Sequence, residues 1–221
     1  MAKLSPAYRE DQLQKPPLDV REYLDEHFLK DLPNITKPNP KLLVVFAGGT
    51  GIGKSTLSQK IAKEFNALVL SNDAIKRQLL AFDPSISSAN LNVLTWRYGM
   101  DLYRRLGEIT PNGLVVRDGV IQWYYDKILP VFQRQGYELF IVGYDLSEQK
   151  QRELILGRGD TKTTTAGRLL SILEDQQIHL HRFRLHYTPD VMLTDDTIFD
   201  HERVIAALHE RLRKSQTVPR Q

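Results

Sequence analysis

Short runs of apolar residues alternate along this chain with longer stretches in which apolar positions recur every three or four residues. The longest run, Leu42–Ala47, contains no polar residue, as expected of a strand buried on both faces of a parallel sheet. Similar runs predict further strands at Ala67–Ser71, Gly113–Arg117, Glu138–Asp145 and Asp190–Leu193.

Helical periodicity fills the segments between these strands. The predicted helices cover Ser55–Phe65, Asp73–Leu80, Asn92–Ile109, Trp123–Gln135, Ser147–Leu156, Arg168–His186 and His201–Lys214. Strands that alternate with helices form βαβ units with right-handed crossovers, which place helices on both faces of the sheet. We therefore expect an α/β fold, a three-layer sandwich with a mostly parallel central sheet.

Residues 1–40 differ from the rest because they hold more than half of the chain's 11 prolines. One helix is predicted among them, with Asp19 as its N-cap. Its apolar stripe consists of Val20, Tyr23, Leu24, His27 and Phe28. We expect an N-terminal helical arm over residues 1–40, which packs on a main domain over residues 41–221.

Composition excludes several classes of protein. The 221 residues include no cysteine, which excludes disulfides, cysteine-ligated metals and a thiol nucleophile. A net charge of +3 selects no partner by itself. The first residues lack the apolar core of a signal peptide, and no apolar run approaches the roughly 20 residues of a membrane-spanning helix. We expect a cytoplasmic protein with no membrane partner.

A phosphate-binding motif follows the first predicted strand directly. It matches the pattern G-x-x-x-x-G-K-[ST] at every specified position, over Gly48, Gly49, Thr50, Gly51, Ile52, Gly53, Lys54, Ser55 and Thr56. Glycines let successive N–H groups point at one phosphate, and the next helix presents its positive end to it. Lys54 is expected to reach the β- and γ-phosphates, and Ser55 to ligate Mg²⁺. Since no guanine-reading Asn-Lys-x-Asp motif occurs, the expected cofactors are ATP and Mg²⁺.

An acidic residue and two basic residues follow the second predicted strand. Asp73 stands at the strand-to-helix turn, with Lys76 and Arg77 behind it. Turns at the carboxyl ends of strands line the ligand crevice of a doubly wound sheet. Asp73 could therefore accept a proton from a substrate hydroxyl, hold magnesium through water, or cap the helix.

These motifs together resemble the small P-loop kinases of the zeta-toxin and polynucleotide-kinase-like group. The resemblance rests on the glycine-rich loop, the S-x-D-x-I-[RK]-[RK]-x-L pattern around Asp73, and the strand Leu114–Val116 that leads to Asp118. It continues through Gln151–Leu154 and Gly157–Gly159, although only the phosphate loop is specific by itself. It implies a P-loop nucleoside triphosphate hydrolase fold with a helical lid around residues 157–168.

The resemblance also implies roles for the matching residues around an acceptor. Asp73 would be the general base that activates the acceptor hydroxyl. Lys76 stands where the group usually has arginine, so either Lys76 or Arg77 would contact the substrate. Asp118 would lie near Mg²⁺ or the acceptor, with a turn-forming Asp-Gly pair as the alternative. Arg97 is a candidate on its position alone, because it lies in the stretch Asp83–Asp101 after the first strand-end acid, and it could pair with a phosphate or carboxylate of the acceptor.

Arg152 and Arg158 match the arginines at the start of the group's lid. As lid residues they would neutralise charge on the transferring phosphoryl group. Their alternative is solvated helix surface, the usual place of an exposed arginine. Both readings stay open for Arg152, and the glycines that flank Arg158 favour the lid.

The function predicted from these features is an ATP- and Mg²⁺-dependent phosphotransferase that moves the γ-phosphoryl group to a hydroxyl. The zeta-toxin resemblance implies a small-molecule acceptor such as a nucleotide-sugar, and leaves room for an antitoxin-like protein partner. One alternative is a polynucleotide 5′-hydroxyl kinase, although mild basicity does not favour a nucleic-acid partner. Another alternative is an ATP-dependent switch without an acceptor, with the N-terminal arm as its contact surface.

Overall fold

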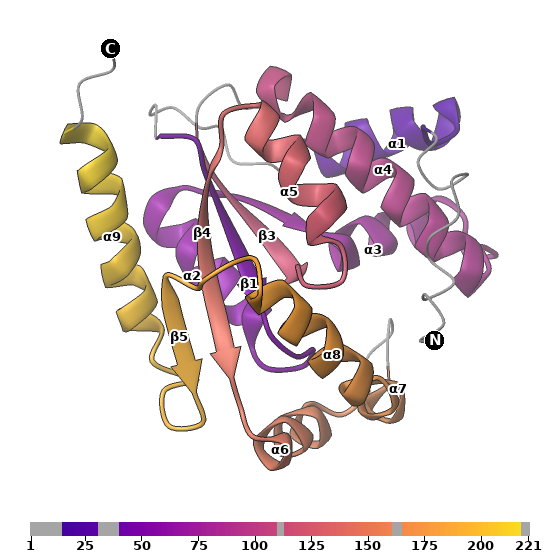
Figure 1. The fold of residues 1–221 in the computed structure, drawn as a ribbon. Helices are drawn as coiled ribbons and strands as arrows, with labels where there is room; N and C mark the ends of the chain where they lie inside the picture. The colour runs from indigo at the N-terminus through magenta and orange to yellow at the C-terminus, as the bar shows by residue number, and fades with distance from the viewer. Residues whose placement is uncertain (1–14, 31–39, 110–112, 161–164, 218–221) are drawn as a thin grey trace. The chain divides into compact units, whose positions relative to one another are not determined.

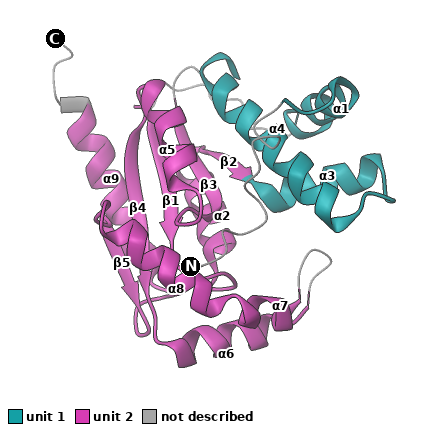
Figure 2. Ribbon diagram, turned by 45° about the vertical axis from the view of Figure 1, so that its right-hand side comes forward, with its two compact units in different colours: residues 1–34, 71–111 teal, residues 35–70, 112–221 magenta. Residues whose placement is uncertain are grey.

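The computed structural model describes residues 15–30, 40–109, 113–160 and 165–217. The chain divides into two compact units, as Figure 2 shows by colour. The first unit contains residues 1–34 and 71–111, and the second contains residues 35–70 and 112–221. Two segments distant in sequence therefore contribute to each unit.

A five-stranded sheet forms the centre of the second unit, with the strand order β2-β3-β1-β4-β5 (Figure 1). The strands are β1 (Leu42–Ala47), β2 (Leu68–Ser71), β3 (Leu114–Val120), β4 (Glu138–Asp145) and β5 (Val191–Thr194). The pairs β1–β3, β1–β4 and β4–β5 are all parallel. Because the order is not sequential, helical crossovers connect the strands.

Helices cover both faces of this sheet. The helices of this unit are α2 (Lys54–Phe65), α5 (Tyr125–Arg134), α6 (Glu148–Arg158), α7 (Ala166–Ser171), α8 (Leu173–Arg184) and α9 (His201–Thr217). Val44, Phe46 and Val116 of the sheet pack with residues of α2 and α9 in one buried core. Figure 1 shows α5 and α8 on the opposite side of the sheet from α2. The expected α/β three-layer sandwich around a parallel sheet is confirmed.

One predicted helix, Arg168–His186, is in fact two helices. The backbone leaves the helical conformation at Ile172 (φ −108°, ψ 5°), which separates α7 from α8. Leu169 of α7 and Leu173 of α8 both pack against Ile155 of α6 in a small separate cluster. Residues four apart share one face of a continuous helix, so this contact does not by itself require the break at Ile172.

The first unit contains α1 (Leu18–Phe28), α3 (Asn72–Phe82) and α4 (Ser88–Ile109). The predicted N-cap of α1 is wrong, because the helix begins two residues earlier than expected, at Leu18 after Pro17, and Asp19 lies inside its first turn. Pro17 makes no side-chain cap hydrogen bond, but its fixed φ, here −51°, suits the start of a helix. The division predicted at residue 40 stays a prediction, and residues 1–14 and 31–39 of the arm lie outside the described residues.

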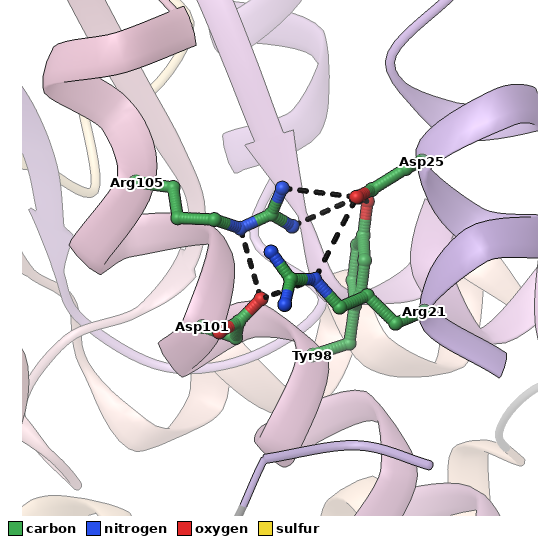
Figure 3. Close-up of polar contacts among 5 residues, drawn as sticks. All are labelled: Arg21, Asp25, Tyr98, Asp101 and Arg105. Atoms are coloured by element: carbon green, nitrogen blue, oxygen red, sulfur yellow. Dashed lines mark hydrogen bonds and ion pairs between the residues drawn. The ribbon is translucent and has the colours of Figure 1, made fainter. Parts of the chain in front are cut away.

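A network of charged residues joins α1 to α4 inside the first unit (Figure 3). Asp25 of α1 accepts hydrogen bonds from both terminal nitrogens of Arg105, at 2.9 and 2.8 Å, and from the Tyr98 hydroxyl at 3.0 Å. Asp101 lies 2.9 Å from Arg105 Nε and 3.3 Å from Arg21 Nε. Two carboxylates therefore balance two guanidinium groups in a partly buried site.

Candidate functional site

The phosphate loop runs from Gly48 at the end of β1 to Gly53, and α2 begins at Lys54. Gly51 and Gly53 adopt left-handed φ angles of 78° and 86°, which favour glycine. Among the described residues, none accepts a hydrogen bond from the backbone N–H groups of Gly51, Ile52 or Gly53. These donors lie at the positive end of α2, so the loop has the geometry of an anion site.

Lys54 is buried beside this loop, with 7% of its surface exposed. Its Nζ donates a hydrogen bond to the carbonyl oxygen of Gly49. Burial lowers the pKa of Lys54 to about 7, while the charge of Asp118 opposes the shift and that of Arg158 adds to it. The charged groups of Asp118 and Arg158 therefore act on the lysine of the phosphate loop.

Ser55 and Asp118 meet at the start of α2, where the Ser55 hydroxyl donates a hydrogen bond of 3.1 Å to Asp118 Oδ1. A bulge in β3 brings Asp118 to this position: Val44 pairs with Val116, but Phe46 pairs with Val120. Bulges commonly redirect a side chain next to a functional site. Asp118 therefore lies in a bulged strand rather than in the turn considered as its alternative.

A hydroxyl and a carboxylate are the hard oxygen ligands that Mg²⁺ prefers, so Ser55 and Asp118 fit this ion chemically. Within the described ranges, no group of three or more His, Cys, Asp or Glu side chains could hold a metal ion. Magnesium in phosphate-transferring sites typically has one or two protein ligands, with phosphate oxygens and water as the others.

The two arginines predicted for the lid lie on α6. Arg152 forms an ion pair with Glu148 one turn earlier, with Nη2 2.7 Å from Oε1, and half of its side chain is exposed. Arg158 is exposed at the last residue of α6, and its charge acts on Lys54. Part of the predicted lid, residues 161–164, lies outside the described residues.

The predicted acceptor residues Asp73, Lys76, Arg77 and Arg97 belong to the first unit, on α3 and α4. Ser71 is the N-cap of α3, because its hydroxyl accepts a hydrogen bond from the N–H of Ala74 at 3.4 Å. Asp73 therefore lies in the first turn of α3 and is not its cap. The roles of these four residues stay predictions.

Three buried glutamines surround the first half of the phosphate loop, and sequence reasoning missed all of them. Gln122 exchanges two hydrogen bonds with the backbone of Gly48, at 3.2 Å to Oε1 and 2.8 Å from Nε2. Gln176 of α8 contacts Thr50, and Gln151 of α6 donates to a carbonyl at the end of β4. For Gln176 a signal exists, because it interrupts an apolar stripe of the helical pattern. Gln122 and Gln151 carry no comparable mark.

Arg117 is a buried charged residue near the site that the sequence analysis also did not identify. Its side chain is 2% exposed, its Nη1 donates a 3.1 Å hydrogen bond to the carbonyl of Val120, and its Nε has no partner among the described residues. A Cβ at Gly119 would lie 3.2 Å from Nη1 of Arg117. Arg117 therefore packs inside the bulge that carries Asp118.

A family model described as an AAA domain matches residues 43–182, well over half of the chain. No curated protein sequence matches the chain significantly. Solved structures with a similar fold include a chain of the PezAT toxin–antitoxin system of Streptococcus pneumoniae, 15% identical, which covers 85% of this chain and 81% of its own length at a TM-score of 0.54. A candidate kinase from Chloroflexus aurantiacus is 16% identical, with coverages of 80% and 98% and a TM-score of 0.55.

The tunicamycin resistance protein of Deinococcus radiodurans is a third similar structure. It is 13% identical, with coverages of 76% of this chain and 95% of its own, and a TM-score of 0.50. At these identities the likeness concerns the fold alone, a parallel sheet with helices on both faces. None of the described helices has the length and apolar character needed to cross a membrane.

Proposed function

Because the chain belongs to this AAA domain family and has a P-loop kinase-like fold, we propose that it is an ATP- and Mg²⁺-dependent phosphotransferase. The observation that carries the proposal is the arrangement of Lys54, Ser55 and Asp118 around the phosphate loop. A buried lysine, a hydroxyl with a carboxylate, and successive N–H groups with no acceptor among the described residues match the three parts that hold a triphosphate and its metal ion.

Each residue of this group has a separate task. The N–H groups of Gly51 to Gly53 would donate hydrogen bonds to phosphate oxygens. Lys54 would replace its hydrogen bond to the Gly49 carbonyl with one to a phosphate oxygen. Ser55 and Asp118 would hold Mg²⁺, which supplies positive charge to the phosphate oxygens when bound. Arg158, with Arg152 one and a half turns earlier on the same helix, would add positive charge from the side of α6.

The acceptor is proposed to be the hydroxyl of a small molecule such as a nucleotide-sugar. Asp73 would accept its proton, and Lys76, Arg77 and Arg97 would bind its anionic groups. Support for Asp73 comes from α3, where Ser71 already caps the helix and leaves the carboxylate without that structural task. The fold likeness to a chain of a toxin–antitoxin system is compatible with such an acceptor and with a protein partner.

The test is ATP consumption by the purified full chain with Mg²⁺ and a panel of sugars, nucleosides, nucleotide-sugars, and RNA or DNA ends. We expect one acceptor class to increase ATP consumption and to become phosphorylated. Asp73→Asn should keep its affinity for ATP and lose transfer by roughly 10²- to 10⁴-fold. Glu22→Gln, which neutralises an exposed carboxylate on α1, is the control and should match the wild type.

Three results would contradict the proposal in different ways. ATP hydrolysis that no acceptor changes would indicate a nucleotide-dependent switch. Phosphorylation of oligonucleotide ends with strong salt dependence would indicate a polynucleotide kinase. If the protein does not bind ATP, the phosphate loop is not a triphosphate site.

A further inference from the structure

Gln176 is a buried polar residue on α8, with 1% of its surface exposed. Its Oε1 accepts a hydrogen bond of 2.9 Å from the backbone N–H of Thr50, and its Nε2 donates one of 2.8 Å to the Thr50 hydroxyl. One side chain of α8 therefore holds both the backbone and the side chain of a residue in the phosphate loop.

The position of Gln176 on its helix is otherwise apolar. The buried residues one turn before and one turn after it are Leu173 and Leu180, and Phe183 follows in the same stripe. Burial of an amide without hydrogen bonds is unfavourable, whereas a leucine here would complete the stripe. The amide is thus matched to Thr50 rather than to the packing of α8.

A second contact joins α8 to the same loop by another path. His179, three residues after Gln176, stacks on Trp123 with the ring centroids 4.5 Å apart and the planes at 21°. Trp123 follows Gln122, which holds Gly48 by two hydrogen bonds. These contacts link the two ends of the same loop segment. Gly48 is bonded to Gln122 in the segment after β3, the neighbouring Trp123 stacks on α8, and α8 returns to the phosphate loop through the bonds of Gln176 to Thr50.

These contacts divide the phosphate loop into two halves. The N–H groups of Gly48 and Thr50 donate to glutamines, while those of Gly51 to Gly53 are directed to no described acceptor. Thr50 directly precedes the second half, so a movement of Thr50 would displace the N–H groups that remain for an anion.

We infer that Gln176 is a positioning residue that fixes Thr50 and thereby couples the position of α8 to nucleotide binding at the phosphate loop. The inference rests on the proposed function, because it takes a nucleotide as the ligand of the loop. A loop that is already held in one conformation loses less conformational entropy when a ligand binds. The affinity for nucleotide should therefore depend on Gln176. Such coupling is reciprocal, so a nucleotide bound at the loop should in turn shift the position of α8.

The experiment uses Mg·ADP as the probe and Trp123 as a reporter of α8. The chain has two tryptophans, so Trp96→Phe leaves Trp123 as the single one in the full-length protein. Mg·ADP should change the emission of Trp123 in this background, because Trp123 stacks on the same helix that carries Gln176. Gln176→Leu should abolish this change and weaken the affinity for Mg·ADP roughly five- to fifty-fold.

Two further variants separate positioning from folding. Thr50→Val removes the hydroxyl that Gln176 contacts and should weaken binding, while Thr50→Ser keeps it and should restore wild-type affinity and emission. The double variant Gln176→Leu/Thr50→Val should bind as well as Gln176→Leu alone, because Gln176→Leu already removes the hydrogen bond to the Thr50 hydroxyl that Thr50→Val removes. Gln177→Leu, an exposed neighbour on α8, is the matched control and should change nothing.

The outcomes distinguish the inference from the proposed function. If the wild type does not bind Mg·ADP, the proposed function and the inference are both overturned. If the wild type binds and Gln176→Leu binds equally well with the same emission change, the inference alone is wrong. Equal losses in Gln176→Leu and Gln177→Leu would also overturn it, since the effect would then come from α8 in general.

Discussion

At the scale of single residues, the buried charge of Lys54 gives the fold a measurable dependence on pH. Burial lowers the pKa of Lys54 to about 7 from an ordinary value of 10.5. Between these two values the unfolded chain binds more protons than the folded one, so the free energy of unfolding should rise with pH in that window. The rise can reach about 1.4 kcal/mol per pH unit for one group.

Chemical unfolding of the wild type and of Lys54→Met, from pH 5 to pH 9 in buffer with a chelator, measures this effect. The wild type should gain stability relative to Lys54→Met as pH rises, while below pH 7 the difference should become constant. Parallel curves for the two proteins over the whole range would show that Lys54 stays charged in the folded state.

The residues of the site differ in how far sequence could identify them. Lys54 and Ser55 belong to a contiguous motif, and their spacing determines where the backbone places them. Asp118 was identifiable from its strand, but its contact with Ser55 depends on a bulge that no local pattern predicted. Gln122 acts through hydrogen bonds to Gly48, a residue far away in sequence, so its type alone indicated nothing.

At the scale of elements, α1 is tied to α4 by charge as well as by apolar packing. Asp25 accepts three hydrogen bonds, two from Arg105 and one from Tyr98, and its side chain is 28% exposed (Figure 3). Asp25→Asn keeps the shape but replaces the negative charge, which leaves Arg105 with Asp101 as its remaining acidic partner in the described network. We expect a loss of about 1–3 kcal/mol in the free energy of unfolding.

Urea unfolding of Asp25→Asn beside Glu22→Gln tests this expectation on one helix. Glu22 is an exposed carboxylate on α1, and its neutralisation should change stability by less than about 0.5 kcal/mol. Equal stability of the two variants would mean that the network adds little to the packing of Leu24 and Phe28.

Element boundaries were predictable where they depend only on the local sequence and not on contacts with another element. The bounds of β1 and β4 agree with the predicted runs, since β1 is wholly apolar and charged residues mark both ends of β4. The break at Ile172 was not predictable, because neither Ile172 nor a residue beside it is a glycine or proline, the usual sequence signals of a helix break. The extension of β3 to Val120 likewise depends on pairing with β1.

At the scale of the whole molecule, each compact unit is built from segments that are not consecutive in the sequence. Residues 71–111 lie between β2 and β3 in sequence, yet they form one unit with the N-terminal helix. The phosphate loop belongs to the other unit and was recognisable because its motif is continuous. Asp73 was a candidate from its place at a strand-to-helix turn, but the grouping of its helix with α1 was not predictable, because helix pairing between distant segments leaves no periodic signal in either one.

Deletion of residues 1–38 should therefore affect the two units differently. It removes Val20, Leu24 and Phe28, which are buried, and leaves Arg105 without Asp25. Hydrogen exchange of α3 and α4 should become faster, by orders of magnitude if the first unit unfolds locally. Affinity for Mg·ADP should stay within about threefold of the wild type, because the loop and its glutamines lie in the second unit.

Leu24→Ala is the graded version of this deletion, because it keeps the chain length and removes one fully buried side chain of α1. Its cavity should cost about 2–5 kcal/mol and accelerate exchange in the same helices. If Asp73 is the base, both proteins should also lose acceptor-dependent turnover while they retain nucleotide. Unchanged exchange in α3 and α4 after the deletion would contradict this expectation, and would favour α1 as a separate contact surface for a partner.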